Sequence, residues 1–228
     1  MLRKLLFCIT ALFFIHAMNA VTIYHPRFSR IDLVCGVRPS VSDTDIVFCG
    51  AAAFTRIYGW TEFSHDLIAG DHVSGGVLYT GYACPETETT VGNTGTFVWY
   101  DGQWQILPGD ASEAKQLAQQ HGGMAFSEEL IVQDGRYHYN LLTERYRDKA
   151  GFYRVLADLN GVLTIIESET LTFGAFVDEL LLLGVRNALF IDMGSVRYSF
   201  VREGGVLHEL GTDKKDFPYA SNWIVFYK

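Results

Sequence analysis

The sequence predicts an α+β (mixed α/β) domain, in which a long twisted mixed sheet is packed by two or three helices. Three observations carry this prediction. Short apolar runs bounded by glycine, aspartate and asparagine recur along the chain, which is typical of strands. Asp-Gly and Asn-Gly pairs lie between such runs and indicate hairpins. Two further segments carry the start and stop signals of helices.

Strands dominate the first half of the chain. We expect them at residues 32–37, 45–49, 76–82, 96–100 and 103–107. Asp101-Gly102 joins the last two as a two-residue turn, because this pair tolerates the positive φ angles that tight hairpins need. Ser112 then caps a helix over residues 113–120, which ends at Gly122-Gly123 and has a mostly polar surface.

The second half adds further strands and a longer helix. We expect strands at residues 130–133, 153–158, 163–167, 188–192, 197–201 and 223–227. Asp134-Gly135 and Asn160-Gly161 form the turns, and the second of these lies between two apolar runs and predicts a hairpin. An amphipathic helix over residues 172–183 is closed by Gly184 and leads directly into the strand at 188–192.

The first twenty residues have the pattern of a secretory signal. Arg3 and Lys4 precede an apolar stretch at 5–15, and small residues follow at 17–20. The apolar stretch is shorter than the roughly 20 residues that cross a membrane. We therefore expect a secreted or periplasmic protein whose residues 21–228 form one domain with no transmembrane segment.

The charge of the chain is unfavourable for binding nucleic acid. Its formal net charge is -8, and losing the two signal cations makes it more negative. Cys35, Cys49 and Cys84 remain after the signal, an odd number. A Cys35–Cys49 or a Cys49–Cys84 disulfide is compatible with the sequence, and so are three buried thiols.

Asp192 is the first candidate catalytic residue, because it ends the apolar run at 188–191. A carboxylate at the end of a buried strand has its pKa shifted by burial or by a cationic partner, as catalysis requires. The amide of Gly194 and the hydroxyl of Ser195 would bind an anionic oxygen beside it. The alternative is an aspartate that caps its own turn.

Glu167 and Arg154 extend this candidate site. Glu167 ends the strand at 163–167, and two such carboxylates make the pair that cleaves glycosidic bonds, with their separation deciding between retention and inversion. Arg154 alternates with apolar residues, so it either enters the same cleft and binds phosphate or pairs with an acid on a neighbouring strand.

Two histidines flank a short loop in a mirrored arrangement. His65-Asp66 and Asp71-His72 suggest a metal site, but zinc needs three or four convergent ligands, so we expect no metal and no cofactor here. His72 precedes a flexible Ser-Gly-Gly sequence and is a candidate substrate contact. The small residues from Gly50 onward would let the backbone approach a ligand closely.

The order of these features resembles a known family. Residues 154–195 run through a strand, Asn160-Gly161, a strand, a helix, a strand and Asp192-x-Gly-Ser195. This resembles the phosphodiester glycosidase domain of the lysosomal mannose-phosphate uncovering enzyme and its secreted bacterial relatives. The segments at 50–54, 124–135 and 221–225 look like further parts of that domain, so the resemblance spans roughly residues 46–226.

The resemblance implies a hydrolase that releases a sugar from a sugar-phosphodiester. Asp192 and Glu167 would be the catalytic carboxylates, and Arg154 would hold the phosphate. The remaining substrate-binding residues that it implies are His72, Gly194, Ser195 and Asn222, with a carbohydrate or sugar-phosphate as ligand.

Met193 stands where the family turn has a glycine, and alanine replaces the asparagine of the early turn. A catalytically degenerate protein that binds glycans or has a structural role in the cell envelope is therefore the alternative hypothesis. The sequence does not predict the oligomeric state.

Overall fold

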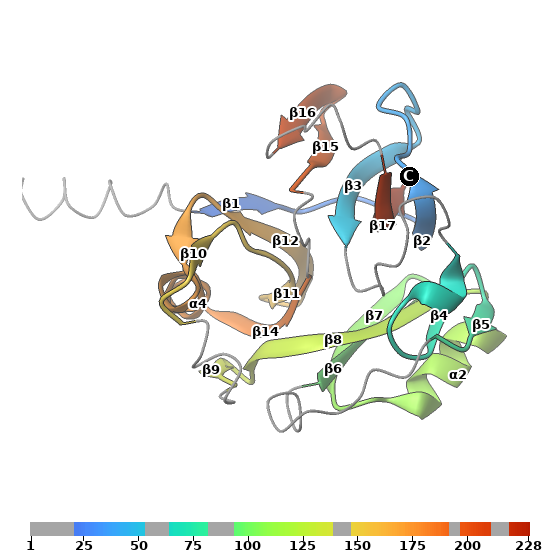
Figure 1. Cartoon of the computed structure of the whole chain (residues 1–228), viewed down its shortest axis with the longest axis horizontal. Coiled ribbons are helices and arrows are strands. Elements are labelled where there is room, and N and C mark those ends of the chain that lie inside the picture. Colours follow the sequence, from blue (N-terminus) through green and yellow to red (C-terminus); the bar gives the residue numbers. More distant parts are fainter. Residues whose placement is uncertain (1–20, 53–63, 82–93, 139–146, 192–196, 211–218) are drawn as a thin grey trace, which may run out of the picture.

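The computed structural model describes residues 21–52, 64–81, 94–138, 147–191, 197–210 and 219–228. These residues form seventeen strands, two α-helices and one short 3-10 helix, so the fold is mainly β (Figure 1). The predicted α+β fold with one mixed sheet packed by helices is wrong. Several antiparallel sheets take its place, and the two helices cover only part of them.

The larger sheet has ten strands. Its main path runs β1-β12-β11-β14-β8-β4-β5, with β6 and β9 also paired to β8 and β7 paired to β6. The bounds are β1 Val21–Tyr24, β4 His72–Ser74, β5 Val77–Tyr79, β6 Thr94–Tyr100, β7 Gln103–Pro108, β8 Met124–Gln133, β9 Arg136–Tyr137, β11 Arg154–Leu159, β12 Val162–Ser168 and β14 Val185–Phe190.

The second sheet has five strands in the order β16-β15-β3-β17-β2. Its bounds are β2 Arg30–Val37, β3 Ile46–Ala52, β15 Ser199–Glu203, β16 Val206–Leu210 and β17 Tyr219–Tyr227. A further pair, β10 Ala150–Gly151 and β13 Leu171–Thr172, forms a two-stranded sheet.

Every strand pair in the described part of the chain is antiparallel, which explains the correction to the fold class. Two-residue turns join neighbouring strands directly, so no crossover helix is needed. The predicted turn residues Asp101, Asp134 and Asn160 have positive φ angles of 49°, 49° and 56°. The hairpin predictions are confirmed, although they favour antiparallel sheets over a mixed one.

The main core lies between the two sheets. Ile31, Phe48 and Ile224 of the five-stranded sheet belong to the same buried cluster as Leu156 and Ile165 of the ten-stranded sheet. One sheet therefore covers the apolar face of the other, which is the role that the sequence analysis gave to helices. Figure 1 shows β3, β17 and β2 above the strands around β8.

Both predicted helices are present. α2, Ser112–Gln120, packs on the side of β4, β6 and β8 that faces away from the five-stranded sheet. α4, Phe173–Leu182, is capped at its N-terminus by Thr172, whose side chain accepts a hydrogen bond from the Ala175 amide. Its buried face joins the second apolar cluster, formed with the outer faces of β11, β12 and β14. No helix among the described residues has the length and apolarity needed to cross a membrane.

Cys35 and Cys49 are free thiols, so the structure does not contain a disulfide between them. They lie on opposite faces of the five-stranded sheet, with Cys35 against the inter-sheet core and Cys49 in the outer cluster. Burial raises the pKa of both thiols, that of Cys35 to about 11. Cys84 and the predicted signal at residues 1–20 lie outside the described residues.

Candidate functional site

Arg154 and Glu167 lie opposite each other in the hairpin of β11 and β12. The two-residue turn at Asn160-Gly161 sets this register, because each step away from the turn pairs the next two residues. Side chains alternate along a strand, so Arg154 and Glu167 face the same side as Leu156 and Ile165. Both polar side chains therefore enter the layer between the two sheets.

Arg154 is almost wholly buried, with 1% of its surface exposed. Its Nε donates to Oε1 of Glu167, and its Nη1 donates to the carbonyl oxygen of Ala51 at 2.8 Å. Its Nη2 has no hydrogen-bond partner among the described residues. A buried guanidinium nitrogen without an acceptor costs free energy, so this atom is available to an anionic ligand.

Glu167 links the two sheets. Its Oε1 also accepts a hydrogen bond of 2.8 Å from the hydroxyl of Ser199, which lies on β15 of the five-stranded sheet. Tyr24 on β1 is buried close by, and its burial, followed by the charge of Glu167, raises its pKa to about 12. The carboxylate thus lies among an arginine, a serine and a neutral phenol.

Gly50 on β3 makes room for the arginine. A Cβ at this position would lie 2.9 Å from Nη1 of Arg154 and 2.7 Å from the ring of Phe48. The small-residue segment that begins here was predicted to admit a ligand. At Gly50 the space is taken by the Arg154 side chain, and residues 53–55 of that segment lie outside the described residues.

Asn222 on β17 is the second polar residue with unused hydrogen-bonding groups. It is fully buried, and neither its Oδ1 nor its Nδ2 has a partner among the described residues. It pairs with Ala52 on one side and Cys35 on the other. By alternation it shares the inner face with Ile224 and Phe226, so its amide faces the layer that Arg154 enters.

Asp192, Gly194 and Ser195 lie outside the described residues, so the structure does not test their predicted roles. Both ends of the segment 192–196 are nevertheless placed. The amide of Ile191 donates to the carbonyl oxygen of Arg154 at 2.9 Å. The chain is described again from Arg197, two residues before Ser199, which contacts Glu167. The described residues on either side of this segment therefore lie near Arg154 and Glu167.

His72 is not part of this cluster. It lies on β4, which is separated from β11 by β14 and β8 in the sheet order. β4 contacts β8 at Ala125, whereas β14 contacts β8 at Leu130 and Val132, near the other end of that long strand. The structure therefore brings together Arg154 and Glu167, places Asn222 on the facing sheet, and leaves His72 apart.

Sequence reasoning missed three contributors to the cluster. Ser199 lies on a strand whose pairing partner could not be inferred, Ala51 contributes only its backbone oxygen, and Tyr24 comes from a strand that was not predicted. Only the alternation of polar and apolar residues from Arg197 to Phe200 gave a signal. Among the described residues, no three His, Cys, Asp or Glu side chains are grouped so as to hold a metal ion.

Comparison with known proteins gives a likeness in structure alone. No protein-family model matches the chain, and no curated protein matches it in sequence. Eleven chains of solved structures match it. One is the catalytic domain of zebrafish N-acetylglucosamine-1-phosphodiester α-N-acetylglucosaminidase, described as auto-inhibited by its pro-peptide. That match covers 91% of this chain and 76% of the other, with a TM-score of 0.58 and 13% identity. The chain therefore has the fold of a phosphodiester glycosidase domain.

Proposed function

We propose that this protein is a secreted glycosidase that hydrolyses a sugar-phosphodiester. The observation that carries the proposal is the set of unused polar groups between the sheets. Nη2 of Arg154 and the amide of Asn222 are buried without partners, on a fold shared with an enzyme whose name specifies a sugar-1-phosphodiester. Fold alone does not determine chemistry, so the argument depends on the residues.

The phosphate of the substrate would bind at Arg154. Nη1 of this residue is near Gly50 and Ala51 on β3, and Asn222 lies across from Ala52 on the adjacent strand. A phosphodiester oxygen would accept from Nη2, and Nδ2 of Asn222 supplies a further donor in the same layer. Two buried donors without acceptors are stabilised by an anion, and Glu167 holds the guanidinium in place.

Asp192 and Glu167 are the catalytic carboxylates of this proposal. A phosphate monoester is a good leaving group, so the reaction needs a carboxylate at the anomeric carbon more than a strong general acid. Asp192 follows Ile191 in the sequence, and the amide of Ile191 donates to the carbonyl oxygen of Arg154. Gly194 and Ser195 follow in the same segment and would bind phosphate oxygens.

The test uses an aryl diester of a sugar 1-phosphate, measures release of the free sugar and of the aryl phosphate, and compares the protein with matched variants. We expect turnover by the native protein and its loss in Asp192→Asn. Asp178→Asn, at an exposed position on α4, is the control and should retain activity. Equal activity in Asp192→Asn and Asp178→Asn would remove Asp192 from the mechanism.

Arg154→Lys tests the binding of the phosphate separately from the cleavage step. Lysine keeps the charge but loses the fork that contacts Glu167 and Ala51, so we expect a raised KM for the diester. Binding of the diester by the native protein without any turnover would contradict the glycosidase proposal and favour a glycan-binding protein. For the proposed secretion, N-terminal sequencing of the exported protein should find a mature chain that begins near residue 21.

A further inference from the structure

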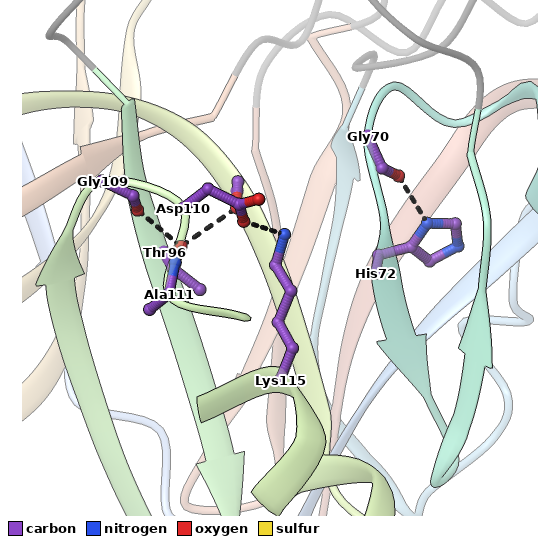
Figure 2. Close-up of polar contacts among 8 residues, drawn as sticks. Gly70, His72, Thr96, Gly109, Asp110, Ala111 and Lys115 are labelled. Atoms are coloured by element: carbon purple, nitrogen blue, oxygen red, sulfur yellow. Dashed lines mark hydrogen bonds and ion pairs between the residues drawn. The ribbon is translucent and has the colours of Figure 1, made fainter. Parts of the chain in front are cut away.

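His65 and His72 form a second polar pair, far from Arg154 along the sheet, in which His72 is buried and His65 is half-buried. His65 belongs to the 3-10 helix η1, His65–Leu67, and His72 opens β4. Nδ1 of His65 lies 3.0 Å from Nε2 of His72, and Nδ1 of His72 lies 3.2 Å from the carbonyl oxygen of Gly70. Figure 2 shows the second of these contacts beside the Lys115–Asp110 ion pair.

The carbonyl of Gly70 determines which nitrogens carry protons. A carbonyl oxygen only accepts hydrogen bonds, so Nδ1 of His72 is the donor. His72 is fully buried, and this burial lowers its pKa to about 4, so it is neutral and its Nε2 carries a lone pair. Nδ1 of His65 must then donate to that lone pair, which leaves Nε2 of His65 as the unprotonated nitrogen.

The geometry is that of a hydrogen bond between two rings. The ring centroids lie 5.3 Å apart, and the N···N distance together with the two ring radii accounts for that separation, so the two nitrogens point at each other. A metal ion between them would need about 2.0 to 2.1 Å to each nitrogen, which a head-on distance of 3.0 Å does not allow. The separation therefore fits a hydrogen bond between the two rings and not a metal ion that bridges them.

Tyr79 stacks on His65, the outer ring of the pair, and restricts the plane of that ring. Its ring lies 3.9 Å from that of His65 with an angle of 11° between their planes. Tyr79 is also paired with His72 across β4 and β5. The imidazole of His65 is thus held by a stacking partner on its face and by a hydrogen bond at Nδ1, and both restrict the direction of Nε2.

We propose that His65 and His72 form a general-base pair, in which Nε2 of His65 takes a proton from water and His72 is the positioning residue. The proton leaves the water oxygen for Nε2, and His65 becomes an imidazolium whose Nδ1 still donates to His72. The oxygen keeps the electron pair and can bond to an electrophile. This pair lies outside the Arg154 cluster, so the inference does not depend on the proposed glycosidase activity.

The charges around the pair are mixed. Burial lowers the pKa of His65, and the charges of Asp32 on β2 and Asp66 on η1 oppose that shift because both favour the protonated ring. Those that act on His72, besides its burial, are His65 and Lys115 on α2, which disfavour protonation, and Asp71, which favours it. Burial therefore keeps both rings neutral at neutral pH, the two aspartates favour a proton on His65, and Lys115 disfavours one on His72.

Nitrogen NMR of the histidine rings tests the general-base pair in the intact protein. The native protein should show both rings with their proton on Nδ1 at neutral pH, the less common neutral form. On acidification, Nε2 of His65 should gain a proton before His72 does, and exposed His208 serves as the reference ring. A proton on Nε2 of His65 at neutral pH, or protonation of His72 first, would overturn the proposal.

Two substitutions then test the positioning role of His72. Glutamine can place an acceptor where Nε2 of His72 lies, whereas phenylalanine keeps the ring shape and has no acceptor. In His72→Gln we expect His65 to keep its proton on Nδ1, and in His72→Phe to lose that preference. The same tautomer in both variants would refute the role. If His72→Phe does not fold, the native spectrum and His72→Gln still decide.

Discussion

Two polar clusters lie at different places on the ten-stranded sheet. The loss of contact with water is compensated by opposite charges in one and by hydrogen bonds between neutral rings in the other. Arg154 and Glu167 carry full charges, share one hydrogen bond, and leave Nη2 of the arginine unused. His65 and His72 are linked to each other and to Gly70 in one directed chain of hydrogen bonds. The first arrangement suits the binding of a charged ligand, and the second suits the movement of a proton.

The difference follows from where each pair lies. Arg154 and Glu167 are on central neighbouring strands, where a hairpin register places them face to face. A charge at such a depth requires an opposite charge. His65 and His72 are near the short strands β4 and β5 at the end of the sheet, and an imidazole there can become neutral instead.

Removal of the Arg154 charge should have the largest effect on the free energy of unfolding. Arg154→Met leaves Glu167 inside the protein with the Ser199 hydroxyl but without its cation, which typically costs about 3 to 5 kcal/mol of unfolding free energy. The double variant Arg154→Met/Glu167→Leu should recover much of that loss, because no uncompensated charge remains. Urea unfolding measures both, with exposed Glu169→Gln as control. A double variant as unstable as the single one would show that the charges do not compensate each other.

A methyl group at Gly50 should have the next largest effect. Its Cβ would lie within 3 Å of the ring of Phe48 and of Nη1 of Arg154, so Gly50→Ala should cost about 1 to 3 kcal/mol through overpacking. Gly151→Ala is a matched control, because the nearest atom there, the hydroxyl of Tyr153, is 3.2 Å from the added Cβ and a smaller displacement relieves the contact. Equal stability of the two variants would mean that Gly50 does not hold space for the arginine.

The sequence contained enough information to predict the pairing of Arg154 with Glu167, but not the contact between His65 and His72. Asn160-Gly161 predicts a two-residue turn, and from that turn the pairing of Arg154 with Glu167 follows by counting. The sequence analysis left open whether Arg154 binds a ligand or pairs with an acid, and the structure shows the pairing together with an unused nitrogen.

The parts that could not be predicted depend on contacts between distant segments. The sequence does not show which strands belong to each sheet or that the two sheets face each other. The core between them was therefore predicted to lie between a sheet and helices. The His65–His72 contact depends on a 3-10 turn and a three-residue strand, both too short to show a period. The mirrored His-Asp pattern drew attention to these residues, but the aspartates do not form the observed link, which joins the two histidines directly.

The histidine pair should make stability depend on pH. In the folded protein the pKa of His72 is about 4, against about 6.5 in an unfolded chain. Between these values the unfolded state binds more protons, so stability is greatest above pH 6.5 and falls toward pH 4. The slope from one such group is at most about 1.4 kcal/mol per pH unit. Thermal unfolding from pH 4 to 7 measures it, and His72→Phe should flatten the curve. An unchanged curve in that variant would assign the acid sensitivity to other groups.

Asn222→Leu should have the smallest effect on stability and the opposite sign. The amide has no hydrogen-bond partner in the described structure, and leucine has nearly the same shape without polar atoms to bury. We expect a gain of about 1 kcal/mol in urea unfolding, together with weaker binding of a sugar-phosphodiester measured by calorimetry. Trp223→Phe is a useful contrast, since its Nε1 already donates to Gly36 at 2.9 Å and its loss should destabilise the protein. A destabilised Asn222→Leu would show that the amide has a structural partner. Stabilisation with unchanged ligand binding would remove Asn222 from the phosphate site while leaving Arg154 in it.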